Sequence, residues 1–182
     1  MAHLNIEIKA TFSNQKHIRE TLKSRNADFI GTDHQLDTYF NVRRGRLKLR
    51  EGNIENYLIY YEREDIEGPK KSKVILYKTT PDPALKEILS KVLGVLAVVD
   101  KKREIYFIDN VKFHIDTVKN LGGFVEIEAI DRDGNIGEEK LREQCTFYRD
   151  LFKIRQDELI AVSYSDLLLT KRRHKKCQKN LL

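Results

Sequence analysis

The amino-acid sequence predicts an α+β fold: a closed eight-stranded antiparallel β-barrel with helices packed outside it. Between residues 35 and 130, apolar and polar residues mostly alternate, which is typical of strands whose two faces meet different surroundings. Short turns join these strands, which favours antiparallel neighbours over the parallel strands of a doubly wound sheet. So many consecutive antiparallel strands commonly close into a barrel, because closure removes the unpaired edges.

Five strands and one helix are expected in the first half of the chain. In residues 4–10, Ile6 and Ile8 share one face and Glu7 and Lys9 share the other, as in a half-buried strand. The other elements of this half are a helix at 13–27, with Ser13 or Asn14 as its N-cap, and strands at 35–42, 45–51, 56–65 and 73–80.

The second half of the chain begins with a helix over residues 84–93, which Gly94 ends. Three more strands, separated by short turns, are expected at 95–108, 111–118 and 123–130. Two helices, at 137–152 and 156–169, complete the fold.

The net positive charge of the chain comes from its C-terminal end. Of the 34 Lys and Arg residues, six lie in residues 171–182, which contain no acid, and the rest of the chain therefore has 28 basic and 28 acidic residues. We interpret residues 1–170 as a single domain and residues 171–182 as a basic tail. Because the domain itself is neutral, the net charge of +6 does not favour a nucleic-acid-binding function.

The sequence favours neither a protein built on disulfides or on cysteine-bound metal nor a secreted or membrane-spanning protein. The two cysteines, Cys145 and Cys177, form neither a disulfide framework nor a metal-ligand spacing. The chain has no secretory signal pattern at its start, and its longest apolar run, residues 92–99, is too short to span a membrane. We therefore expect a cytoplasmic protein without a membrane partner.

The polar faces of the predicted strands carry ionisable side chains two residues apart, so each pair shares one face. The basic positions are Lys9, Lys48, Arg50, Arg63, Lys78, Lys101 and Arg103. The acidic positions are Glu7, Asp116, Glu126 and Glu128.

These charges have two interpretations. For a single strand, a charged face that meets water is the more common arrangement. Across the strands, however, basic and acidic residues are segregated, and the opposite faces are apolar enough to pack under helices, as with Val125 and Ile127. If helices cover the apolar faces outside the barrel, the charged faces converge inside it, where they must be paired or neutralised by a ligand.

A cavity with this lining has a defined chemistry. Lys and Arg side chains bind phosphate groups through charge-assisted hydrogen bonds. Clustered Asp and Glu side chains bind hard divalent cations through their oxygens. Together they indicate phosphoryl or nucleotidyl transfer, in which positioning and charge neutralisation do most of the catalysis. The chain has no glycine-rich phosphate loop, so side chains must hold the phosphates.

Eight segments resemble, in consistent order along residues 4–168, those of the CYTH domain family, also called triphosphate tunnel metalloenzymes. They are NIEIK (5–9), DTYF (37–40), GRLKLRE (45–51), LIYYER (58–63), VDKKRE (99–104), FHID (113–116), LGGFVEIE (121–128) and SYSDLL (163–168). The family includes class IV adenylate cyclases and thiamine and inorganic triphosphatases. The segments are most similar to the class IV adenylate cyclase-like branch.

The resemblance implies a triphosphate bound in the barrel together with Mg²⁺ or Mn²⁺. The implied metal ligands are Glu7, Asp116, Glu126 and Glu128, and the implied catalytic residues are Glu7, Lys9 and Asp116. The implied phosphate-binding residues are Lys9, Lys48, Arg50, Arg63, Lys78, Lys101 and Arg103. We interpret His114 as structural, and Tyr39 and Tyr61 as packing residues at the barrel ends.

Three functions remain open at this point. The resemblance favours a class IV adenylate cyclase-like conversion of ATP to cyclic AMP and pyrophosphate. The alternative is hydrolysis of tripolyphosphate, thiamine triphosphate or a nucleoside triphosphate. A non-catalytic binder of nucleotides or polyphosphate is the third hypothesis, because Asn5 replaces the first acid of the family's E-x-E-x-K signature. Association into a homodimer also stays open.

Overall fold

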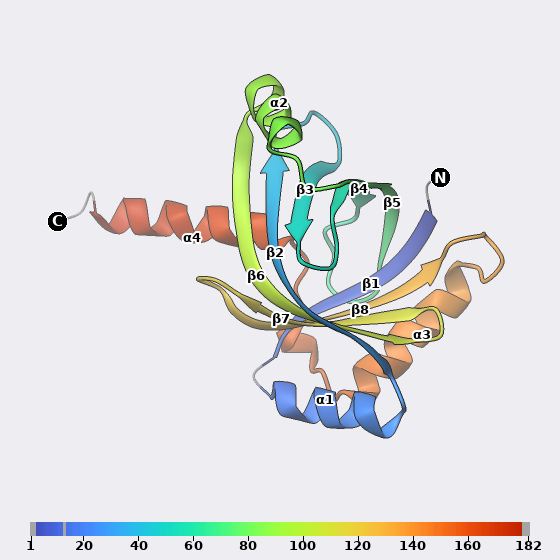
Figure 1. The fold of residues 1–182 in the computed structure, drawn as a ribbon. Coiled ribbons are helices and arrows are strands. Elements are labelled where there is room, and N and C mark those ends of the chain that lie inside the picture. Colours follow the sequence, from blue (N-terminus) through green and yellow to red (C-terminus); the bar gives the residue numbers. More distant parts are fainter. Residues whose placement is uncertain (1–2, 13, 180–182) are drawn as a thin grey trace.

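The computed structural model describes residues 3–12 and 14–179, in which eight strands form a closed antiparallel barrel (Figure 1). The strands are β1 (His3–Thr11), β2 (Asp28–Phe40), β3 (Arg46–Gly52), β4 (Tyr57–Arg63), β5 (Lys70–Lys78), β6 (Val95–Ile108), β7 (Val111–Val118) and β8 (Gly122–Asp131). The helices are α1 (Gln15–Ser24), α2 (Pro83–Leu93), α3 (Glu138–Leu151) and α4 (Tyr164–Lys179), with a 3-10 turn at Gln156–Glu158.

The order of strands around the barrel is β1-β5-β4-β3-β2-β6-β7-β8, and β8 pairs again with β1. Every neighbouring pair is antiparallel, so the barrel has no free sheet edge. The predicted α+β class and the closed eight-stranded barrel are therefore confirmed.

Two predicted strands begin in the wrong place. β2 starts at Asp28 instead of residue 35 and pairs with β6 from Asp28 to Phe40. The register of this pair shifts between Phe29 and Gly31, which breaks the alternation that would have indicated a strand. β5 starts at Lys70 instead of residue 73, because its first residues pair with β1.

The main hydrophobic core lies outside the barrel, between the outer faces of β1, β7 and β8 and the helices α1 and α3 (Figure 1). Ile6 and Ile8 point outward into this core, as predicted, and both are completely buried. Phe113 and Leu22 are also fully buried there, and burial of each such side chain contributes about 1.5–3 kcal/mol. Because the apolar faces pack outward, the polar faces of the same strands line the interior of the barrel.

The prediction of a second C-terminal helix at residues 156–169 is wrong for the residues before Tyr164. After the 3-10 turn the chain is extended, and the Ile160 N–H donates to the Lys9 carbonyl oxygen at 2.8 Å. α4 begins only at Tyr164, because Ser163 and Asp166 cap its start: the Asp166 N–H donates to the Ser163 hydroxyl at 3.2 Å, and the Ser163 N–H donates to the Asp166 carboxylate at 3.0 Å.

α4 extends away from the barrel and continues through Lys179 (Figure 1). Residues 171–179 of the predicted tail are therefore helical, whereas residues 180–182 lie outside the described part of the chain. α1 begins after Asn14, whose side chain accepts from the His17 N–H, while the alternative cap Ser13 lies outside the described residues. Among the residues that the structure describes, no helix is both long and apolar enough to cross a membrane.

Candidate active site

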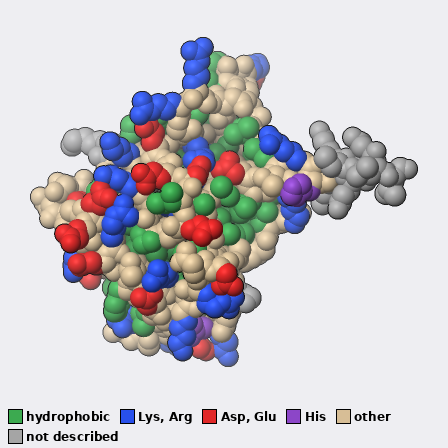
Figure 2. Space-filling view, turned by 180° about the vertical axis from the view of Figure 1, so that it is seen from behind, with side chains coloured by type: hydrophobic (Ala, Val, Ile, Leu, Met, Phe, Trp, Pro, Cys, Tyr) green, Lys and Arg blue, Asp and Glu red, His purple; other side chains and the backbone are tan. Residues whose placement is uncertain are grey.

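The barrel encloses a cavity of about 490 Å³, to which all eight strands contribute side chains. Glu7 and Lys9 of β1, Arg63 of β4 and Arg103 of β6 are part of its lining. On the outer surface, by contrast, acidic and basic side chains are interspersed over the face in Figure 2 and form no basic stripe there. The charged groups that the sequence singled out, with the exception of Lys78, therefore converge in or directly behind the cavity wall.

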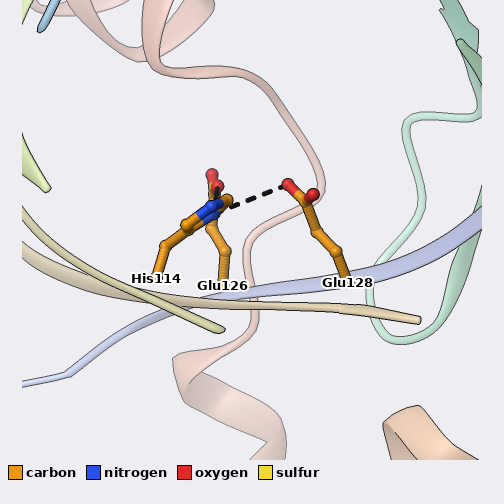
Figure 3. Close-up of side chains that lie close together, drawn as sticks. All are labelled: His114, Glu126 and Glu128. Carbon is orange, nitrogen blue, oxygen red and sulfur yellow. Dashed lines mark hydrogen bonds and ion pairs between the residues drawn. The ribbon is translucent and has the colours of Figure 1, made fainter. Parts of the chain in front are cut away.

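One wall of the cavity carries a cluster of His114, Glu126 and Glu128 (Figure 3). Their ligand atoms lie within 4.8 Å of one another. His114 and Glu126 are opposite each other in the β7–β8 register, and the His114 Nδ1 lies 3.1 Å from the Glu126 carboxylate and 3.6 Å from that of Glu128. Figure 3 shows all three side chains pointing to the same side of the sheet.

The two carboxylates of this cluster have opposite electrostatic surroundings. Burial favours the neutral form of Glu126, but Lys9 at 2.6 Å and Arg103 at 2.7 Å hold its pKa well below the usual range. Burial raises the pKa of Glu128, and the nearby Glu126 carboxylate adds to this shift, although Lys112 opposes it. A further positive charge next to Glu128 would therefore stabilise the ionised form of its carboxylate.

His114 is a neutral imidazole in this environment. Burial, with Arg103 and Lys112 nearby, lowers its pKa to about 3. Its second ring nitrogen, Nε2, is buried and has no hydrogen-bond partner among the described residues. Carboxylate oxygens and a neutral imidazole are donors that bind divalent cations, so the cluster fits Mg²⁺ or Mn²⁺ through its oxygens. His114, which the sequence led us to interpret as structural, therefore lies within the cluster.

Glu7 and Asp116 lie in different places relative to this cluster. Glu7 lines the cavity, is directly opposite Glu128 in the β1–β8 register and accepts from Arg63 at 2.6 Å. Asp116 is fully buried behind the cavity lining. It accepts from the Nε of Arg103 at 2.7 Å and from the Tyr164 hydroxyl at 2.8 Å, and so fixes the orientation of Arg103.

A second charged cluster surrounds Asp37 of β2, which the sequence reasoning did not single out. Arg50 donates to its carboxylate at 2.8 and 3.0 Å, Lys48 at 2.9 Å and Lys101 at 2.7 Å. The predicted segregation of signs is therefore wrong here, because an acid lies among the basic residues. One carboxylate and three cations leave excess positive charge, which an anionic ligand can neutralise.

Burial also affects the ammonium groups of the cavity wall. Burial lowers the pKa of Lys101 to about 7, with Asp37 opposing the shift and Arg50 and Arg103 adding to it. The Lys9 ammonium lies 3.7 Å above the centre of the Tyr164 ring, in addition to its ion pair with Glu126. Lys101 therefore depends on the nearby Asp37 carboxylate to stay protonated.

Lys78 is not brought to the cavity. It lies exposed at the end of β5. Lys70, at the start of the same strand, is fully buried, and its ammonium donates to the carbonyl oxygens of Ile160 and Ala161 at 2.5 and 3.1 Å. Sequence reasoning missed Lys70 because it placed the start of this strand at residue 73. The alternation of Lys70, Ser72 and Val74 was the available signal.

The remaining predicted positions lie along the cavity wall. Asn5 lines the cavity, and its side-chain oxygen is buried without a hydrogen-bond partner among the described residues. Tyr39 and Tyr61 belong to an apolar cluster with Ile59, and the Lys48 ammonium lies 5.4 and 5.8 Å from the centres of their rings. Both tyrosines therefore pack and also face the cavity.

Known proteins share both the sequence pattern and the fold. A model of the CYTH domain matches residues 3–161. A protein of Methanocaldococcus jannaschii named "Putative adenylate cyclase" is 28% identical over 173 residues, which cover 90% of this chain and 98% of that protein.

Two solved structures superpose on the barrel. A protein of Pyrococcus horikoshii OT3 does so with a TM-score of 0.75 and 23% identity, covering 90% of this chain and 98% of its own. A protein of Hippeastrum, described as a "Putative adenylyl cyclase" with a dominant triphosphatase activity, does so with a TM-score of 0.58 and 13% identity, covering 93% of this chain and 95% of its own. Because the domain model matches most of the sequence, the chain belongs to the CYTH domain family, whose members are metal-dependent enzymes that act on triphosphates.

Proposed function

We propose that the protein is a divalent-metal-dependent enzyme that binds a triphosphate inside the barrel and converts ATP to cyclic AMP and pyrophosphate, as class IV adenylate cyclases do. One observation carries the proposal: a carboxylate cluster and an excess of Lys and Arg side chains face the same cavity inside the barrel. The name of the Methanocaldococcus jannaschii relative supports the cyclase form of this activity.

The phosphate groups would be bound by the basic residues of the cavity. Arg103 and Lys9 lie beside the carboxylate cluster, Arg63 lies beside Glu7, and Lys48 and Arg50 surround Asp37. Their mutual pairing keeps these charges stable without a ligand, and phosphate oxygens can take over part of this pairing when a triphosphate enters. Lys101 supports this set from its fully buried position.

Glu126 and Glu128, with Glu7 opposite Glu128, would hold Mg²⁺ or Mn²⁺. The bound metal would neutralise phosphate charge. In the cyclase reaction the 3′-oxygen of ATP forms a bond to the α-phosphorus, the bond from that phosphorus to pyrophosphate breaks, and the 3′-hydroxyl proton leaves. Glu7 lies on the cavity wall and is our candidate for accepting this proton, and Lys9 for stabilising the charge on the phosphate. Asp116 would act through Arg103, as a positioning residue.

Hydrolysis of a triphosphate is the second candidate, because the Hippeastrum protein with the same fold has a dominant triphosphatase activity. Both reactions would use the same cavity and differ in which phosphorus meets the nucleophile. Asn5 lies where the family signature has an acid, and its buried side-chain oxygen has no hydrogen-bond partner in the described part of the chain. This difference is the reason to test for turnover directly.

The test measures turnover of ATP, thiamine triphosphate and tripolyphosphate with Mg²⁺ or Mn²⁺, with cyclic AMP and phosphate as readouts. We expect cyclic AMP and pyrophosphate from ATP, lost in Glu126→Gln and Glu128→Gln. The matched control is Glu143→Gln, since Glu143 is an exposed residue of α3 that pairs only with Lys140 among the described residues. Phosphate release without cyclic AMP would support the triphosphatase instead. Metal-independent turnover, or none, would contradict both enzymatic functions.

A further inference from the structure

One further acid inside the barrel comes from a turn and not from a strand. Glu55 lies between β3 and β4, and its side chain enters the cavity. One carboxylate oxygen accepts from the Nη1 of Arg50 at 2.8 Å and from the Gln35 amide at 3.1 Å. The other accepts from the Lys112 ammonium of β7 at 2.5 Å. Glu55 therefore joins two cations that belong to different walls of the barrel.

The turn that carries Glu55 is held in a fixed shape. The buried carboxylate of Asp33 accepts from the backbone N–H groups of Asn53, Ile54 and Glu55 at 2.6, 2.9 and 3.0 Å. Gly52 leaves room for this arrangement, because a Cβ there would lie 2.7 Å from the Asp33 carboxylate and from the Glu55 carbonyl oxygen. The fixed backbone of this turn therefore directs the Glu55 side chain into the cavity.

The surroundings of Glu55 keep it ionised. Burial favours its neutral form, but Arg50 and Lys112 hold its pKa far below the usual range. A carboxylate that accepts charge-assisted hydrogen bonds from an arginine and a lysine occupies the kind of position that a phosphate oxygen would otherwise take.

We propose that Glu55 is a specificity-determining residue that competes with the phosphate groups of the ligand for Arg50 and Lys112. This inference rests on the proposed binding of a triphosphate in the barrel. A ligand that reaches these two cations must displace the carboxylate, so only ligands with enough negative charge compensate for its loss. The remaining contacts of Arg50 allow the exchange, because Asp37 still holds its Nε and Nη2 atoms after Glu55 has moved away.

The test is the affinity of the metal-free protein for tripolyphosphate, measured by isothermal titration calorimetry. In Glu55→Gln the competing charge is gone, and we expect binding about tenfold tighter or more. Glu55→Ala should show the same change, so the conclusion does not depend on one variant. The control is Glu51→Gln, which removes an equal charge from the same hairpin but outside the cavity, where Glu51 pairs with Lys86 at 2.6 Å. The affinity of Glu51→Gln for tripolyphosphate should equal that of the wild type.

A double-mutant cycle with Lys112→Met separates competition from a general change in charge. If Glu55 competes for Lys112, the gain from Glu55→Gln must shrink when Lys112 is absent. Unchanged or weaker tripolyphosphate binding in both Glu55 variants, with a wild type that binds, would overturn the inference but not the proposed function. A wild type that binds no tripolyphosphate, either metal-free or with Mn²⁺, would overturn both.

Discussion

The Asp37→Asn substitution removes the one negative charge that Lys48, Arg50 and Lys101 share. Asp37 is 1% exposed and accepts hydrogen bonds from these three residues at 2.7 to 3.0 Å. Breaking a buried ion pair by removing one partner typically costs about 3–5 kcal/mol, because the remaining charge is left uncompensated. In a protein of this size about 1 kcal/mol corresponds to about 2–4 °C, so we expect the Tm to fall by about 6–20 °C.

The assay is thermal unfolding at pH 7, followed by circular dichroism. The control is Asp100→Asn, whose carboxylate also has two basic neighbours, His34 at 2.8 Å and Lys119 at 3.3 Å, but lies at the surface. Each surface pair contributes only about 0–1 kcal/mol, so the Tm of Asp100→Asn should fall by less than about 8 °C and by less than the Tm of Asp37→Asn. Equal shifts in the two variants would refute the role given to Asp37.

The same interaction has a pH signature. The cationic neighbours Arg50, Lys101 and Lys48 outweigh the effect of burial and hold the pKa of Asp37 well below its unfolded value of 3.8. The folded state therefore binds this proton less readily than the unfolded state, and the contribution of Asp37 is present above about pH 4 and lost as the pH falls. The wild type and Asp37→Asn should become more alike in stability on acidification, and a difference that grows would contradict this linkage.

Three further predictions follow from buried groups. Burial lowers the pKa of Lys101 to about 7, so its ammonium loses its charge above pH 7. The affinity of the wild type for tripolyphosphate should then fall by up to about tenfold per pH unit relative to that of Lys101→Met, in which only the ligand and the other residues titrate. The same dependence of affinity on pH in both proteins would refute this prediction. Burial raises the pKa of the Cys145 thiol to about 12, so native Cys177→Ala protein should not react with a thiol reagent until it unfolds, and rapid labelling would contradict the burial. Ser163→Ala removes the α4 cap and should lower stability by about 1 kcal/mol in a denaturant titration; an unchanged midpoint would show that the cap contributes little.

The barrel could be predicted from the sequence because alternation places two unlike faces on each strand. For β1, Ile6 and Ile8 share one face and Glu7 and Lys9 share the other, and closure with helices outside buries the first pair while it gathers the second. The basic and acidic residues at i and i+2 were predicted for the same reason, and all of them except Lys78 lie in or directly behind the cavity wall.

The positions that were missed depend on long-range contacts. Lys70 became part of the interior only because its strand pairs with β1 further than its sequence indicated. Asp37 alternates with Tyr39, but its role as the centre of an ion-pair cluster depends on three cations from β3 and β6. Glu55 lies in a turn whose shape is set by Asp33, a residue 22 positions earlier in the chain. Periodicity carries no information about such contacts.

The proposed function requires that the interior of the barrel bind a triphosphate and a divalent metal together. A crystal structure with tripolyphosphate and Mn²⁺, recorded at a wavelength at which manganese scatters anomalously, would show both. We expect an anomalous peak within bonding distance of Glu126 and Glu128, with the phosphate chain contacting Arg103 and Lys9. Phosphate density or a manganese peak found only outside the barrel would contradict it.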